Sequence, residues 1–222
     1  MYAADGPLHR LSRTYAGGAF SVLDVGAYDP GFITSFDWIP TKVVVDIESW
    51  DDSNFVQDAA VHRRVWAQTR GVAFVVGDFT QLKWGTRFDL VFCNQVVEHL
   101  PHGVVELFVE QLMRVARVLI VTTTADLPKG TLRGHVQDPI PRSEFESWFE
   151  DRPGNATHAP VRGRIVEYLR VPGGNPNNNY TLPNALLGRR VPAFQHIVVW
   201  KKARAQKQHA HAHAHVRSSG GP

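Results

Sequence analysis

The sequence predicts an α/β fold with a doubly wound, mostly parallel sheet. Short apolar runs rich in β-branched residues recur between residues 20 and 122, and stretches with helical spacing lie between them. Strand–helix alternation repeated this often is typical of a parallel sheet with helices on both faces. The last third instead holds two strand-like segments joined by a loop rich in Gly, Pro and Asn. This pattern predicts a hairpin added at one edge of the sheet.

The strands are predicted from apolar runs bounded by turn-forming residues. Pro40, for example, marks a break before the second run, whose β-branched residues suit a strand buried on both faces. In chain order the predicted strands are Phe20–Val25, Thr41–Ile47, Val72–Val76, Phe88–Cys93, Val118–Thr122, Arg164–Val171 and Phe194–Trp200.

The helices are predicted from apolar residues three and four positions apart. Residues 1–19 form a lead-in, as helix or loop. Ser143 is expected to cap a short helix ending at Glu150, with Glu146 completing a capping box. The two longer helices are Asp52–Arg70, with Phe55, Ala59, His62 and Trp66 on one face, and Gly103–Val115, with Val104, Leu107, Phe108, Gln111, Leu112 and Val115.

The composition fits one domain of 222 residues with 43% apolar residues, enough for a core. No run of apolar residues is long enough to span a bilayer, and the N-terminal residues lack the apolar middle of a secretory signal. Cys93 is the only cysteine, so no internal disulfide can form. We therefore expect a soluble cytoplasmic protein without a membrane partner; the sequence predicts no oligomeric state.

The net charge of +3 comes from the C-terminal end. Without the five positive charges there, the remainder of the chain has a net charge of −2, so nucleic acid is an improbable partner for the folded body. These charges belong to Lys201, Lys202, Arg204, Lys207 and Arg217. Residues 203–222, in which His209, His211, His213 and His215 alternate with Ala, are predicted to be a disordered basic tail.

The first predicted strand ends in a short glycine-containing loop, from Asp24 to Gly31. In a parallel sheet this layout places Asp24, Gly26 and Asp46 around one crevice at the carboxyl ends of two strands, where nucleoside-like cofactors bind. A triphosphate-binding loop is excluded because Phe32-Ile33 stands where Lys and Ser or Thr are needed. A dinucleotide site is disfavoured because Tyr28 occupies the position of the second glycine.

The third candidate cofactor is S-adenosylmethionine, which carries a sulfonium, an adenosine and an amino-acid end but no phosphate. It needs one acid near the loop, one for the ribose hydroxyls and a polar contact for the adenine. Asp24, Asp46 and Asp78 supply these groups at three successive strand ends.

Four motifs in this order resemble those of the class I S-adenosylmethionine-dependent methyltransferases. They are Val22-Leu-Asp-Val-Gly26, Val45-Asp-Ile47, Gly77-Asp-Phe79, and the segment Phe88–Leu100 with Phe-Asp-Leu-Val followed by Glu-His-Leu. The resemblance implies a Rossmann-like methyltransferase domain over residues 20–202. It also implies a seven-stranded sheet whose last strand, Phe194–Trp200, is antiparallel.

The resemblance also implies roles for single residues. Asp24 and Gly26 line the methionine end, Asp46 accepts hydrogen bonds from the ribose, and Asp78 meets the adenine. The loop departs from the family pattern, because Tyr28 replaces a glycine. The full set of predicted cofactor-binding residues is Asp24, Gly26, Ala27, Tyr28, Gly31, Asp46, Ile47, Asp78, Phe79, Asn94 and Gln95.

The candidate catalytic residues are Glu98, His99 and His135. Glu98 and His99 follow the fourth predicted strand at the mouth of the crevice, and a histidine there can act as a base near neutral pH. His99 could equally fix the start of the next helix. The segment Gln95–His99 resembles a Glu-x-x-Glu-His metal motif of some O-methyltransferases, but Gln95 replaces the first carboxylate, so no metal site is predicted.

The sequence therefore predicts an enzyme, an S-adenosylmethionine-dependent methyltransferase acting on a small-molecule acceptor such as a hydroxyl of a metabolite or sugar. Two alternatives stay open at this point. One is a metal-assisted RNA 2′-O-methyltransferase, and the other is a methyltransferase-like binding protein without activity, which the altered loop allows.

Overall fold

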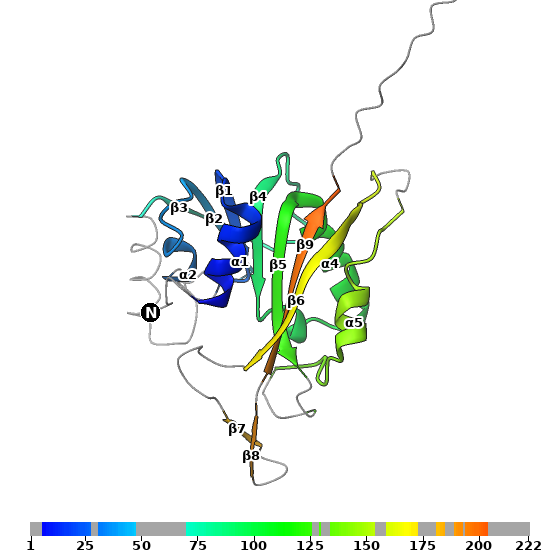
Figure 1. Ribbon diagram of the computed structural model, residues 1–222. Coiled ribbons are helices and arrows are strands. Elements are labelled where there is room, and N and C mark those ends of the chain that lie inside the picture. The colour runs from blue at the N-terminus through cyan, green and yellow to red at the C-terminus, as the bar shows by residue number, and fades with distance from the viewer. Residues whose placement is uncertain are drawn as a thin grey trace, which may run out of the picture.

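The computed structural model describes residues 6–27, 31–47, 70–125, 129, 134–153, 159–172, 181–184, 189–192 and 194–203. The strands of the main sheet are β1 (Ser21–Val25), β2 (Thr41–Asp46), β3 (Val72–Val76), β4 (Phe88–Asn94), β5 (Ala116–Ala125), β6 (Gly163–Pro172) and β9 (Phe194–Lys202). They form one seven-stranded sheet in the order β3-β2-β1-β4-β5-β9-β6 (Figure 1). This order confirms the predicted α/β fold.

The first five strands are parallel, and β9 is antiparallel to both of its neighbours, β5 and β6. The chain leaves β1 toward β2 on one side and returns to β4 on the other, which creates a switch point between β1 and β4. In open α/β sheets, ligands bind beyond the carboxyl ends of the strands at such a point. A ligand is therefore expected beside the residues that follow β1 and β4.

Helices cover both faces of the sheet (Figure 1). Within the described residues, the α-helices are α1 (Pro7–Ala16), α2 (Gly31–Thr34), α4 (His102–Val115) and α5 (Arg142–Ser147). On one face, Leu11 of α1 and Ile33 of α2 pack with Phe92. On the other face, Phe108 of α4 and Phe145 of α5 belong to the second core. Because strand side chains alternate between faces, each strand contributes to both cores.

The buried face of α4 differs from the predicted one. Val104 and Leu107 are 38% and 65% exposed, whereas Val105 and Val109 are buried. Helical spacing allowed either set, since apolar residues occupy most of the surface of this helix. The face of α4 that packs on the sheet is therefore shifted around the helix axis from the predicted face. Phe108, Leu112 and Val115 are buried as expected. We have no physical account of the exposed Leu107.

The predicted cap of α5 is wrong. The helix starts at Arg142 after Pro141, and no side chain caps it. Proline is favoured at a helix start because it has no N–H to satisfy. Ser143 therefore lies inside the helix, and Glu146 accepts hydrogen bonds from Arg142 instead, at 3.0 and 2.9 Å.

The connection between β6 and β9 contains two short strands that the sequence did not predict. These are β7 (Thr181–Asn184) and β8 (Arg189–Pro192), which pair antiparallel. The pair extends away from the main sheet in Figure 1. Since Ala125 at the end of β5 pairs with Phe194, and Phe194 pairs with Pro172, this connection leaves the sheet at the carboxyl edge of β5.

Cys93 of β4 is fully buried. Burial raises the pKa of its thiol well above the ordinary range, and the nearby charges of Glu98 and Asp24 act in the same direction. The thiol is therefore protonated and unreactive at neutral pH.

The predicted helix over residues 52–70 lies almost wholly outside the described residues, as does the basic tail after residue 203. Within the described ranges, no helix combines the length and apolar character needed to cross a bilayer.

Candidate active site

The predicted cofactor acids follow neighbouring strands at one edge of the sheet. Asp24 is 2% exposed and lies one residue before the end of β1, and Asp46 ends β2. The amide of Gly26 donates to the carbonyl of Val45 at 2.8 Å, and the amide of Gly77 donates to that of Asp46, also at 2.8 Å. The turns after β1 and β3 are thus both held by β2. This register places Asp24, Asp46 and the loop with Asp78 along the same edge.

Gly26 lies where the switch point requires a residue without a side chain. Its φ of 73° is in the left-handed region, and an added Cβ would come within 2.5 Å of a methyl carbon of Val96. Val96 follows β4, so the two segments on either side of the switch point touch here. A glycine is needed both for the backbone conformation and for this contact.

Substituting Gly26 with Ala is therefore expected to lower the free energy of unfolding by roughly 1–2 kcal/mol, through backbone strain and overlap with Val96. Adding Val96→Ala should recover the unfolding free energy that is lost through the overlap, but not that lost through the strained backbone φ of residue 26. Denaturant unfolding of the two variants measures this. Equal stability of Gly26→Ala and the unsubstituted protein would contradict the contact.

The other predicted residues near the methionine end lie in different environments. Ala27 is buried at 5% exposure, and Gly31 is the first residue of α2. Ile47, just beyond β2, is 69% exposed, so its side chain is accessible at the edge of the sheet where Asp46 lies. Tyr28 lies outside the described residues.

Asp78 and Phe79 make contacts that stabilise their own loop. One carboxylate oxygen of Asp78 accepts hydrogen bonds from the backbone amide and the hydroxyl of Thr80, at 2.9 and 2.7 Å. Phe79 is 4% exposed and packs edge-on to Phe108 and beside Trp84. Its ring thus belongs to the core, and only its backbone could meet an adenine.

Asn94 and Gln95 lie where β4 ends. Gln95 has a φ of 59°, which is uncommon for a residue with a side chain and often marks a functional position. Its side-chain amide donates to the hydroxyl of Thr122 at 3.3 Å, and that hydroxyl donates to the side-chain Oδ1 of Asn94. The pairing of Asn94 with Thr122 on β5 brings these three polar groups together.

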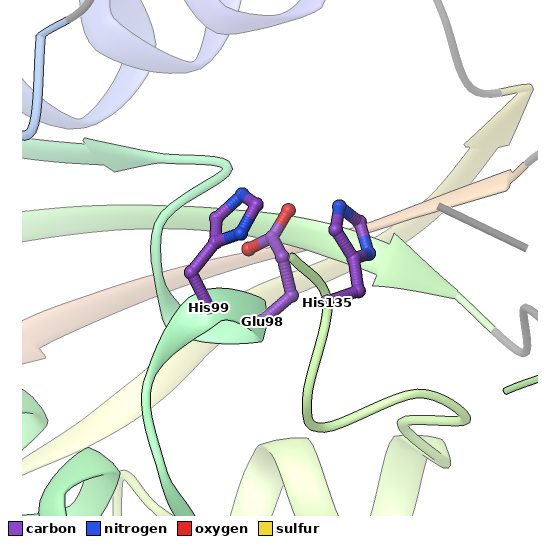
Figure 2. Close-up of side chains that lie close together, drawn as sticks. All are labelled: Glu98, His99 and His135. Atoms are coloured by element: carbon purple, nitrogen blue, oxygen red, sulfur yellow. The ribbon is translucent and has the colours of Figure 1, made fainter. Parts of the chain in front are cut away.

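The three candidate catalytic residues come together directly beyond β4. One ligand-type atom from each of Glu98, His99 and His135 lies within 4.8 Å of the others. Figure 2 shows the carboxylate of Glu98 between the two imidazole rings. The ring centroids of the two histidines are 4.7 Å apart. We refer to these residues as the Glu98–His99–His135 cluster.

Glu98 is fully buried. Its Oε2 accepts a hydrogen bond from the hydroxyl of Thr123 at 3.0 Å, whereas its Oε1 has no hydrogen-bond partner among the described residues. Burial raises the pKa of this carboxyl to about 7, and Asp138 adds to the rise, against the lowering effects of its own backbone, His135 and Thr123. A buried carboxyl that titrates near neutrality is typical of functional sites.

Both histidines are oriented through Nδ1. Nδ1 of His99 lies 3.1 Å from the carbonyl oxygen of Gly134, which can only accept, so this nitrogen carries the proton. Nδ1 of His135 donates to Oδ2 of Asp138 at 2.8 Å, and the hydroxyl of Thr124 donates to Oδ1 of the same carboxylate at 3.0 Å. In a neutral imidazole, this arrangement leaves the lone pair on Nε2.

The loop with His135 is held against Glu98 by the backbone. The amides of Val136 and Gln137 donate to the carbonyl oxygen of Glu98 at 2.9 and 3.3 Å, and the side-chain amide of Gln137 donates to the carbonyl of Leu100. These bonds explain how residues far apart in the chain share one site.

Sequence reasoning missed the polar residues that support the cluster. Thr123 and Thr124 lie just beyond the predicted strand Val118–Thr122, although β5 extends to Ala125, and Asp138 lies in the predicted loop before Pro139. The run of three threonines ending an apolar strand was the available signal, since buried hydroxyls require partners.

Comparison with known proteins agrees with this geometry. A methyltransferase domain family matches residues 34–119. No curated protein sequence matches the chain. Among solved structures, the magnesium protoporphyrin IX methyltransferase of Synechocystis PCC 6803 with bound S-adenosylhomocysteine is similar, with a TM-score of 0.56 and 16% identity over 87% of this chain and 80% of that one.

Two further structures are similar at this level. The N-methyltransferase NodS of Bradyrhizobium japonicum WM9 has a TM-score of 0.56 and 14% identity over 91% of this chain and 100% of that one. The 1,6-didemethyltoxoflavin-N1-methyltransferase of Burkholderia thailandensis, bound to S-adenosylhomocysteine, has a TM-score of 0.54 and 17% identity, covering 91% of this chain and 79% of that one. The family match over residues 34–119 and the sheet order together support the resemblance to the class I S-adenosylmethionine-dependent methyltransferases.

Proposed function

We propose that the protein transfers the methyl group of S-adenosylmethionine to a hydroxyl of a small molecule bound at the Glu98–His99–His135 cluster. The observation that carries the proposal is the position of this cluster, directly beyond β4 and beside the strand ends predicted for the cofactor. The similar structures named for a porphyrin and a toxoflavin precursor support a small-molecule acceptor.

The reaction is an in-line displacement. A lone pair of the acceptor oxygen forms a bond to the methyl carbon while the carbon–sulfur bond breaks, and its electron pair stays on sulfur as a neutral thioether. The acceptor also loses its hydroxyl proton, so an unactivated hydroxyl needs a proton acceptor or another means of lowering its pKa. The buried carboxyl of Glu98 and the Nε2 atoms of the histidines are the groups available for this purpose.

Positioning is the other contribution of the protein. Methyl transfer depends on the alignment of oxygen, carbon and sulfur, and fixed orientation alone can lower a barrier by several kcal/mol. The hydrogen bonds from Thr123 to Glu98 and from Thr124 to Asp138 fix the side chains that would meet the acceptor.

The assignment of Asp46 to the ribose is tested with Asp46→Ala. We expect the affinity for S-adenosylmethionine to fall by roughly 1–3 kcal/mol, because a charged acceptor of hydrogen bonds is lost. Isothermal titration calorimetry measures the affinity. Asp37→Ala is the matched control, since Asp37 is exposed and precedes β2 at the opposite edge. Equal affinities of the two variants would refute the assignment.

An RNA acceptor is the competing candidate. A methylation assay that offers small hydroxyl compounds and structured RNA to the same preparation separates the two. Transfer confined to RNA would overturn the small-molecule proposal.

A further inference from the structure

We propose that the Glu98–His99–His135 cluster binds one divalent transition-metal ion of the zinc type, which holds the oxygen to be methylated. The role of the ion rests on the proposed function, whereas its binding does not. This proposal reverses the expectation from sequence that no metal site exists.

The donor set matches such an ion. Two imidazoles and one carboxylate are a common set of three protein ligands for catalytic zinc, which leaves a position open for water or substrate. Neighbouring ligands of a tetrahedral zinc ion lie roughly 3.4 Å apart. Since the three candidate atoms already lie within 4.8 Å of one another, small side-chain rotations would suffice to bind one ion.

The buried carboxylate of Glu98 is an independent observation that points to a ligand. Glu98 is fully buried, and its Oε1 has no hydrogen-bond partner among the described residues, although Thr123 donates to Oε2. A buried oxygen left without a partner costs free energy. A cation bound to Oε1 removes this cost, which accounts for a carboxylate placed in this position.

The surroundings of the histidines also fit metal ligands. Histidines that bind metals usually donate the proton of their second nitrogen to a carboxylate or a carbonyl, which fixes the ring and leaves the other nitrogen for the metal. Asp138 accepts this proton from His135, and the carbonyl of Gly134 accepts it from His99. Asp138 is in turn fixed by the hydroxyl of Thr124.

The same donor set disfavours magnesium. Magnesium prefers oxygen ligands, whereas imidazole suits zinc and neighbouring transition metals. Gln95, which occupies the position of a second carboxylate in the related motif, uses its amide to donate to Thr122. The cluster thus offers only one carboxylate, and two of its three ligands are nitrogens.

The ion would act as a Lewis acid on the acceptor. Coordination of a hydroxyl oxygen to a divalent cation lowers the pKa of that hydroxyl. Its proton leaves to water before the transfer, and the metal-bound oxygen then attacks the methyl carbon as the carbon–sulfur bond breaks. In this arrangement, the histidines bind the ion through Nε2 and do not themselves accept the proton.

The test must avoid the histidine-rich tail, which could bind metal by itself. We therefore choose the full chain with His209→Ala, His211→Ala, His213→Ala and His215→Ala as the background. After removal of metal with a chelator, calorimetry with Zn²⁺ should give one site per chain. Loading with Co²⁺ should give visible absorption bands of a site with imidazole ligands.

In this background, Glu98→Gln and His99→Gln are each expected to weaken zinc binding by roughly tenfold or more. Asp138→Asn should also weaken it, through His135. His102→Gln is the matched control and should change nothing, because His102 is exposed and its only described charged partner is Glu144. Because His99 is exposed, we expect His99→Gln to fold normally. A loss of zinc binding in this variant is then not explained by misfolding.

No zinc binding in this background, or binding that Glu98→Gln and His99→Gln leave unchanged, would overturn the proposal. Calorimetry with S-adenosylmethionine on the same samples distinguishes a protein that lacks only the metal site from one that also fails to bind the cofactor. A protein that binds the cofactor and methylates an acceptor in the presence of chelator retains the proposed function without the metal.

Discussion

Replacing Glu98 with Gln is expected to lower kcat roughly 10²–10⁴-fold, because the substitution removes the only carboxylate of the cluster that can accept a proton or bind a cation. The shape of the side chain is preserved, and the hydroxyl of Thr123 can still donate to the remaining oxygen. Affinity for S-adenosylmethionine should stay unchanged, since the carboxylates predicted to bind the cofactor, Asp24, Asp46 and Asp78, lie at or just beyond the ends of β1, β2 and β3. Steady-state kinetics and calorimetry together measure both quantities.

Two comparisons sharpen this prediction. Thr123→Val removes the hydroxyl that fixes Glu98 but leaves the carboxylate, so it should reduce kcat less than Glu98→Gln. His102→Gln, on the exposed start of α4, should have full activity. If Glu98→Gln loses cofactor affinity and activity in parallel, Glu98 belongs to the cofactor site and the catalytic assignment is wrong.

The same substitution is expected to stabilise the metal-free protein at high pH. The carboxyl of Glu98 has a pKa of about 7 in the folded protein against an ordinary 4.5, because it is buried. A raised carboxyl pKa means that the folded state holds the proton more tightly than the unfolded state. Its stabilising contribution is therefore complete below about pH 4.5 and is lost as the pH rises to about 7.

The full effect of this shift is about 3 kcal/mol. Between about pH 5.5 and about pH 8.5, in the presence of chelator, the unsubstituted protein should lose about 2 kcal/mol of unfolding free energy relative to Glu98→Gln. Urea unfolding at the two pH values measures the difference, and the comparison cancels groups that titrate in both proteins. A difference that does not change with pH would show that the carboxyl is ionised throughout this range.

The position of the three acids at one edge of the sheet could be predicted from sequence because it depends on local patterns. Apolar runs predicted the strands, and in a parallel sheet the residues after each run meet at one edge, which placed Asp24, Asp46 and Asp78 together. The strand positions were close to those observed; Val72–Val76, for example, was predicted with the bounds of β3. The roles of these acids stay predictions.

The supporting residues of the cluster could not be predicted in this way. His135 reaches Glu98 through backbone hydrogen bonds of Val136 and Gln137, and no periodic pattern encodes a loop that folds back over this distance. Thr123 faces Glu98 because β4 and β5 pair in a particular register. The prediction that Ser143 caps α5 was wrong for a related reason. The helix begins after Pro141, and Glu146 pairs with Arg142 instead of completing a capping box.

The single cysteine, which is buried, makes this protein a convenient subject for spectroscopy. Because Cys93 is protonated and inaccessible, it should not react with maleimide reagents under native conditions. A cysteine introduced at an exposed site, such as Leu107 on α4, would then carry a fluorophore or spin label alone. Paired labels could follow movements around the crevice during turnover in a chain that keeps its natural sulfhydryl.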